Sequence, residues 1–164
     1  MKMSTAAESA VKIFQVQTPE QIAVVRQLFL EYANSLNFSL CFQSFDKELA
    51  SLPGDYAPPS GRLLLAGISG RAAGCVALRP LDATTCEMKR LYVRPEFRAH
   101  KLGRRLAHAV IGEARAASYK RMRLDTVEPV MREAVQLYRT LGFYEIPAYC
   151  ANPIQGALYM ELQL

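Results

Sequence analysis

Hydrophobic and polar positions along the chain repeat with two different periods, and these periods divide it into helices and strands. Apolar residues spaced three and four apart predict amphipathic helices. The predicted helices cover residues 19–35, 46–52, 101–118 and 129–140. Runs rich in β-branched and aromatic residues predict strands. The predicted strands cover residues 11–17, 62–68, 72–81, 86–93, 121–126, 143–146 and 157–164.

The order of these elements predicts a mixed α+β fold. Three consecutive strands between residues 62 and 93 have short connections, which favours an antiparallel meander. We therefore expect a mostly antiparallel central sheet of about six to seven strands, with helices on both faces. No repeat or long linker divides the chain. Residues 1–10 are expected to form a flexible tail, and residues 11–164 a single domain.

Composition places this fold in a broad class. About half of the 164 residues are apolar, which is enough for a substantial core. No apolar stretch approaches the ~20 residues that span a membrane, so we expect a cytoplasmic protein without a membrane partner. Lys and Arg outnumber Asp and Glu by 20 to 15, a net charge of +5 that favours an anionic partner.

Cysteine and histidine contribute no recognisable metal site. The four cysteines include no CxxC pair, and the two histidines do not complete a ligand pattern. We expect free thiols and no bound metal, because disulfides are rare in a reducing cytosol. The cysteines are Cys41, Cys75, Cys86 and Cys150.

The densest group of cations lies between Lys89 and Arg105, where the predicted strand gives way to a loop and then to a helix. A helix N-terminus offers unpaired N–H groups and the positive end of the helix dipole, so it binds phosphate well. Ala99 and Gly103 keep side-chain bulk away from the backbone, and Arg98 adds charge. The segment is a candidate pyrophosphate site; the alternative is a solvated basic helix face.

Two motifs in this half of the chain resemble those of a known family. The first runs from Glu87 to Val93, through Arg94-Pro-Glu-Phe-Arg98, to the loop Arg98–Gly103 and Arg104. It resembles the cofactor signature of the GNAT superfamily of acyl-CoA-dependent N-acyltransferases. The second, Glu133–Glu145, resembles the Tyr-x-x-x-Gly-Phe element of that family. The resemblance is specific over residues 62–146 and implies acetyl-CoA as the cosubstrate.

The resemblance also implies a role for individual residues. The backbone near Leu91 would polarise the thioester carbonyl, as an oxyanion hole does. Tyr138 matches the tyrosine that protonates the departing CoA thiolate. Lys101 stands where a glycine is usual, and Met131 where an asparagine is often found. The implied cofactor-binding residues are Leu91, Val93, Arg98, Lys101, Leu102, Gly103 and Arg104.

Transfer to an amine benefits from a base, because a lysine-like amine is protonated at pH 7. Glu87 is the candidate, since the family often places a carboxylate near the start of this strand. The alternative is an ion pair with Lys89, because alternation along a strand would put Glu87, Lys89 and Leu91 on one face. Tyr138 likewise has an alternative role in core packing.

The predicted function is direct transfer of an acetyl group from acetyl-CoA to a primary amine, without a covalent enzyme intermediate. The alternative is a non-catalytic acyl-CoA sensor of the same fold; another acyl group also stays open. Few aromatic residues interleave with the basic run, which argues against a nucleic-acid partner. The resemblance allows a homodimer. Residues that we expect to line the acceptor pocket are Phe38, Cys41, Phe42, Tyr56, Tyr149, Asn152, Pro153 and Gly156.

Overall fold

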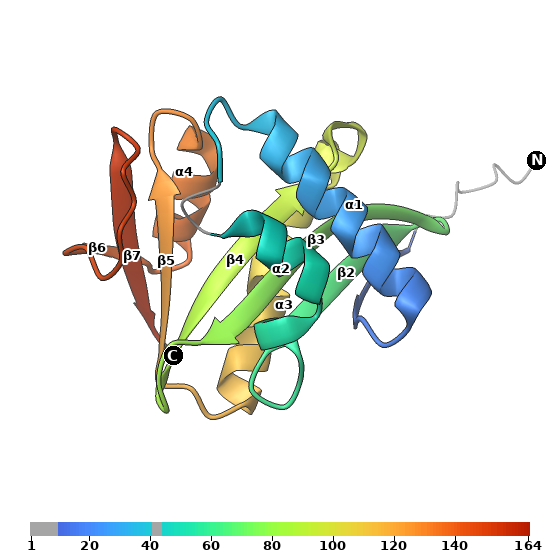
Figure 1. Cartoon of the computed structure of the whole chain (residues 1–164), viewed down its shortest axis with the longest axis horizontal. Coiled ribbons are helices and arrows are strands. Elements are labelled where there is room, and N and C mark those ends of the chain that lie inside the picture. Colours follow the sequence, from blue (N-terminus) through green and yellow to red (C-terminus); the bar gives the residue numbers. More distant parts are fainter. Residues whose placement is uncertain (1–9, 41–43) are drawn as a thin grey trace, which may run out of the picture.

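A seven-stranded sheet runs through the computed structural model, which describes residues 10–40 and 44–164 (Figure 1). The strands are β1 (Val11–Gln15), β2 (Arg62–Ile68), β3 (Arg71–Pro80), β4 (Thr85–Val93), β5 (Arg121–Val127), β6 (Tyr144–Ile146) and β7 (Ala157–Gln163). The α-helices are α1 (Pro19–Ser35), α2 (Phe45–Ser51), α3 (Leu102–Ala116) and α4 (Arg132–Thr140). Two short 3-10 helices are η2 (Gly54–Tyr56) and η3 (Pro95–His100).

The strands lie in the order β1-β2-β3-β4-β5-β7-β6. Every neighbouring pair is antiparallel except β4 and β5, which are parallel. The first four strands form the predicted meander, and β7 lies between β5 and β6. The predicted fold class, a mostly antiparallel sheet between two layers of helices, is confirmed.

Each face of the sheet packs against its own pair of helices, with α1 and α2 in front and α3 and α4 behind in Figure 1. Strand β2 illustrates the division, because side chains alternate between the faces of a strand. Leu63 and Leu65 join the core under α1 and α2, whereas Leu64 and Ala66 join the core under α3 and α4. Burial on both faces explains why β2 is apolar along most of its length.

Local signals in the sequence fix several element ends. The Thr18 hydroxyl caps α1 by accepting a hydrogen bond from the N–H of Gln21, and Gly142 takes a φ of +101° just after α4. Helix α4, however, begins three residues later than predicted. The N–H groups of Val130 and Met131 both donate to the Val127 carbonyl and form a turn, so Val130 is exposed instead of facing the core.

Some expectations fall on residues outside this description. All of the predicted tail except Ala10 lies there, and so do Cys41 and Phe42. Within the described ranges, Cys75, Cys86 and Cys150 are free thiols. No helix in those ranges is long and apolar enough to cross a membrane.

Candidate active site

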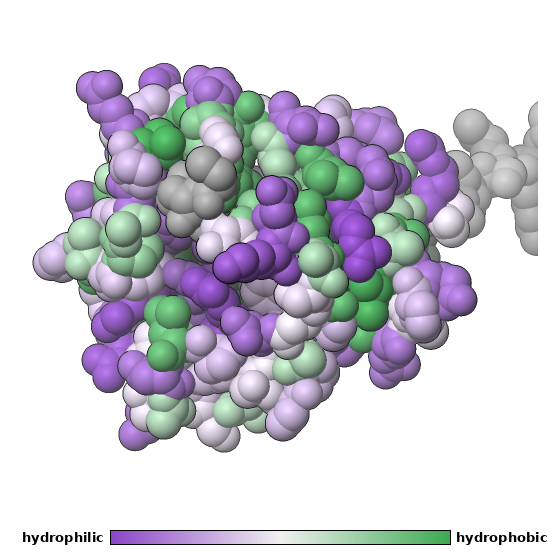
Figure 2. Space-filling view, in the orientation of Figure 1, coloured by the Kyte–Doolittle hydropathy of each residue, from purple (hydrophilic) through white to green (hydrophobic). Residues whose placement is uncertain are grey.

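Strands β4 and β5 separate shortly after they meet. Their pairing covers three residues of each strand and ends at Glu87↔Arg123. Beyond that point the strands diverge (Figure 1), and a cavity of about 620 Å³ lies between them. Its walls come from β4, β5, α1, the start of α3, and α4 with the turn before it. Hydrophilic residues also gather on the α1/α2 face between β5 and α2 (Figure 2).

A β-bulge shapes the β4 wall of the cavity. Against β3, Lys89 pairs with Ala77 and Tyr92 pairs with Cys75, so two residues of β4, Arg90 and Leu91, lie opposite one residue of β3. Arg90 adopts a φ of +59°, which is rare for a residue with a Cβ. The extra residue interrupts the alternation of side chains.

The bulge therefore corrects one expectation. Glu87 and Lys89 do share a face, and their charged groups lie 3.8 Å apart. Leu91 was expected on the same face, but its side chain packs with the core on the α3/α4 side and lines the cavity.

The predicted phosphate loop ends at an uncapped helix N-terminus. Lys101 precedes α3 in the left-handed conformation, with φ 53° and ψ 31°, which is the geometry that favours the glycine usual at this position. No side chain caps the first turn of α3 in this part of the structure. The N–H groups there are consequently available for an anion.

Gly103 lies at the rim of the cavity, one residue into α3. A Cβ added there would meet Val93 and Leu137 at 3.9 and 4.0 Å, ordinary van der Waals distances. Packing within the protein thus does not require a glycine at this position. The absence of a side chain at Gly103 instead leaves open space beside the helix N-terminus. Such a space is suited to a phosphate group.

The predicted cofactor-binding residues divide into two groups. Leu91, Val93, Arg98 and Gly103 line the cavity. Of the others, Lys101 is exposed, Leu102 has its side chain in the core, and Arg104 donates to Thr140 Oγ1 at 3.4 Å. These three can contribute backbone N–H groups or charge beside the opening.

Tyr138 reaches the cavity from α4. It is buried and packs against Phe143, with 5.7 Å between the ring centroids. Burial raises the pKa of its hydroxyl well above the usual value, so the group stays protonated at neutral pH. Core packing and a position beside the cavity are therefore compatible. Met131 also lines the cavity and accepts a hydrogen bond from Thr126.

Glu87 lies at the narrow end of the splay, buried and away from the cavity wall. One carboxylate oxygen is 2.8 Å from Arg79 Nε and 3.8 Å from Lys89 Nζ. The other accepts a hydrogen bond from the Tyr149 hydroxyl at 2.6 Å. The pairing with Lys89 that we considered as the alternative role of Glu87 is present.

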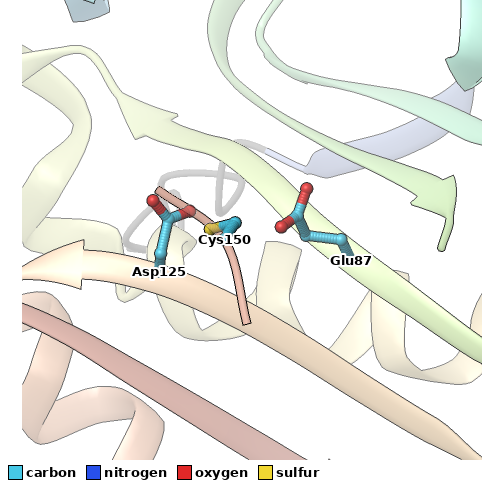
Figure 3. A group of neighbouring side chains, drawn as sticks. All are labelled: Glu87, Asp125 and Cys150. Atoms are coloured by element: carbon cyan, nitrogen blue, oxygen red, sulfur yellow. The ribbon is translucent and has the colours of Figure 1, made fainter. Parts of the chain in front are cut away.

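Asp125 is a carboxylate that the sequence analysis missed. It projects from β5 toward Glu87 of β4 and Cys150 of the segment before β7 (Figure 3), and one polar atom from each lies within 4.8 Å of the others. Unlike Glu87, Asp125 lines the cavity, and it accepts a hydrogen bond from Asn152 at 3.1 Å. Arg79 and Lys89 beside Glu87 disfavour a divalent metal at this cluster.

A signal for Asp125 does exist in the sequence. It alternates with the apolar Met122 and Leu124, which marks it as facing away from the α3/α4 core. The parallel pairing of β4 with β5, which brings it near Glu87, is not readable from that alternation.

The residues expected around the acceptor have mixed outcomes. Tyr149 and Asn152 contact Glu87 and Asp125 as described. Tyr56 instead donates to Glu48 and Phe38 packs with the α1/α2 core, while Gly156 faces Pro129. Nothing places Pro153 in the cavity wall.

Comparison with known families supplies the deciding observation. The model of the Acetyltransferase (GNAT) family matches residues 24–143, most of the chain and the whole splay. The chain belongs to this family. As a GNAT enzyme it is an acyl-CoA-dependent N-acetyltransferase, and the donor predicted from the sequence, acetyl-CoA, is that of its family.

Curated relatives of this acetyltransferase cover nearly its full length. An uncharacterised N-acetyltransferase of Schizosaccharomyces pombe is 40% identical over 100% of this chain and 98% of its own. One of Dictyostelium discoideum is 30% identical over 91% of this chain and 97% of its own.

Solved structures share the fold at lower identity. An acetyltransferase of Streptococcus agalactiae has a TM-score of 0.77 at 22% identity, covering 94% of this chain and 98% of its own. An acetyltransferase of Salmonella typhimurium solved with its cofactor acetyl-CoA has a TM-score of 0.71 at 18% identity, over 94% of each chain.

Proposed function

We propose that this acetyltransferase binds acetyl-CoA in the cavity between β4 and β5 and passes the acetyl group directly to a primary amine. The observation that carries the proposal is the extent of one cavity. It reaches from Gly103, at the uncapped start of α3, to Tyr138 and Asp125 beside the splay. A single bound molecule can thus contact an anion-binding helix end and groups that move protons.

In this proposal the donor lies in the cavity along β4. Its pyrophosphate would accept hydrogen bonds from the N–H groups at the start of α3, and Arg98 and Lys101 would supply positive charge. Its pantetheine arm would lie against β4 from Leu91 to Val93, where pairing with β5 has already ended. A backbone N–H at the bulge, that of Leu91, would polarise the thioester carbonyl.

Tyr138 would protonate the leaving thiolate. The attacking amine forms a C–N bond as the C–S bond breaks, and the CoA sulfur leaves with the electron pair. Tyr138 lies buried beside the cavity and is protonated at neutral pH, so its hydroxyl would donate a proton to that sulfur.

Asp125 is better placed than Glu87 to receive the amine. Its carboxylate lines the cavity, while Glu87 is enclosed by Arg79, Lys89 and Tyr149. Asp125 would hold the incoming ammonium and accept its proton, directly or through water. Glu87 would keep the surrounding groups in place.

The cysteines support direct transfer over an acetyl-cysteine intermediate. Burial raises the pKa of the Cys86 thiol to about 12 and that of Cys150 to about 11, and it raises that of Cys75 further. A thiol with such a pKa offers little thiolate at neutral pH. Within the described chain, no cysteine is an activated nucleophile.

The test is CoA release from acetyl-CoA with a panel of primary amines, together with intact mass before acceptor is added. We expect turnover with at least one amine and no acetylated enzyme. Tyr138→Phe and Asp125→Asn should each lower kcat about 100-fold, a usual contribution of a positioned acid or base. Glu128→Gln, at an exposed ion pair, is the control. Binding of acetyl-CoA without turnover would make the protein a sensor.

A further inference from the structure

Arg90 is held in its unusual conformation by an extensive set of contacts. In a G1 β-bulge the first residue has a positive φ and is normally glycine. Here it is an arginine that is 4% exposed and has a φ of +59°. A side-chain-bearing residue keeps such a conformation only where the surroundings determine it.

Those surroundings come mainly from α2. Glu48 of α2 receives two hydrogen bonds from the Arg90 guanidinium, from Nε at 2.8 Å and from Nη2 at 3.1 Å. A fork of this kind fixes the orientation of both groups. The Tyr56 hydroxyl also donates to this carboxylate, at 2.8 Å.

Aromatic rings and the backbone complete the enclosure. The Arg90 guanidinium lies 5.2 Å from the centroid of the Phe45 ring and 5.9 Å from that of Tyr32. The Arg90 carbonyl accepts a hydrogen bond from the Cys75 thiol at 3.4 Å. The side chain and the carbonyl of the bulge residue are thus both fixed.

We infer that Glu48 is a positioning residue for acetyl transfer, acting through Arg90. The inference rests on the proposed function, in which the N–H of Leu91 polarises the thioester carbonyl. Leu91 follows Arg90 directly, so the peptide that carries this N–H is the one Arg90 orients. A carboxylate on α2 thereby sets the donor geometry in the cavity without touching the substrate.

The chain offers a matched control for this pair. Glu31 of α1 receives a similar fork from Arg94, at 2.9 and 2.7 Å, just after β4 ends. Both pairs tie a helix of the same layer to the β4 segment. Only the Glu48 pair acts on the bulge.

The experiment measures kcat and KM for acetyl-CoA in Glu48→Gln and Glu31→Gln, with the amine that the wild type acetylates best. We expect Glu48→Gln to lower kcat at least tenfold while KM changes less than threefold. Glu31→Gln should stay within twofold in kcat. Equal losses in the two variants, or a Glu48→Gln enzyme with unchanged kcat, would overturn the inference.

A second variant tests whether Glu48 acts through Arg90. Arg90→Lys loses the fork, so the double variant with Glu48→Gln should be no slower than the slower single variant. Losses that multiply would show that Glu48 does not act through Arg90.

The infrared carbonyl stretch of bound acetyl-CoA, labelled with carbon-13 at the carbonyl, supplies a readout besides rate. In Glu48→Gln this stretch should move toward the value that acetyl-CoA shows in water. If Glu48→Gln does not fold, the same movement is expected in Glu48→Asp. An unmoved stretch would overturn the inference. Absence of turnover in the wild type would instead count against the proposed function.

Discussion

The two ends of the β4–β5 pair satisfy their polar groups in opposite ways. At the narrow end, Glu87 is buried and contacts Arg79, Lys89 and Tyr149. At the wide end, β4 has left β5, and the first turn of α3 has no side-chain cap. The narrow end thus satisfies its charges within the protein, while the wide end presents backbone groups to the cavity.

This difference separates groups that stabilise the fold, at the narrow end, from groups that are available to bind a ligand, at the wide end. Burying a charge is costly unless partners surround it, so the narrow end keeps its geometry only with its network complete. Uncapped N–H groups at a surface cost little because water satisfies them until a ligand replaces it. Substitutions at the narrow end should accordingly change stability, and those at the wide end should change binding.

The largest effect on acetyl-CoA binding is expected at Gly103. Gly103→Asp places a carboxylate where the phosphates would lie, and its Cβ fits without a clash. We expect acetyl-CoA at 100 times its wild-type dissociation constant to stabilise the wild type by about 2.7 kcal/mol and the variant by almost nothing. Thermal melting with and without acetyl-CoA measures both.

Gly112→Asp in the same helix is the matched control. A Cβ added at Gly112 meets nothing within 4 Å, and Gly112 is absent from the cavity wall. This variant should keep the full ligand-induced shift. Loss of the shift in both variants would mean that the added charge acts at long range, and the assignment of the phosphate site would fail.

The largest effect on folding stability is expected at the narrow end. Glu87→Gln removes the buried carboxylate that Arg79 and Lys89 share, which should lower the free energy of unfolding by about 3 kcal/mol at pH 7. Urea denaturation measures it. Glu128→Gln, which breaks an exposed pair with Arg139, should stay within about 0.5 kcal/mol.

The Glu87→Gln deficit should also shrink as pH rises. Burial lowers the pKa of Lys89 below 10.5, and Glu87 opposes that shift. Without Glu87 the folded state binds fewer protons than the unfolded state over a wider range below pH 10.5. Stability then rises with pH in that range. A deficit that is constant from pH 7 to 10 would show that the loss of Glu87 does not act through the charge of Lys89.

The contrast between the two ends also marks what could be predicted from the sequence. The elements and the fold class follow from local patterns, such as the apolar run of β2 or the Thr18 cap. The phosphate loop stays a prediction. The splay does not follow from local patterns, because the parallel pairing of β4 with β5 joins segments separated by the whole of α3. Asp125 was missed for that reason.

Unusual backbone conformations also limited what could be predicted from the sequence. Lys101 and Arg90 both have a positive φ, a backbone conformation that is usually occupied by glycine because glycine has no Cβ. At Lys101 the family resemblance had marked a glycine position, so the conformation was indicated. At Arg90 no such signal existed, and plain alternation put Leu91 on the wrong face. The two hydrogen bonds that hold the Arg90 guanidinium go to Glu48 of α2, 42 residues away in the chain, where no local pattern reaches.

The smallest effect on stability is expected at an ion pair beyond the wide end. There Glu31 binds Arg94, and both side chains are about a quarter exposed. The hydrogen bond from Arg94 lowers the pKa of Glu31 below 4.5. A lowered carboxyl pKa contributes stability that is present above pH 4.5 and is lost as pH falls through the folded value. Glu31→Gln should therefore cost about 0.5–1 kcal/mol at pH 7 and progressively less as pH falls below 4.5, measured by urea denaturation. A cost that does not fall with pH would assign the effect to packing of the Glu31 side chain and not to its charge.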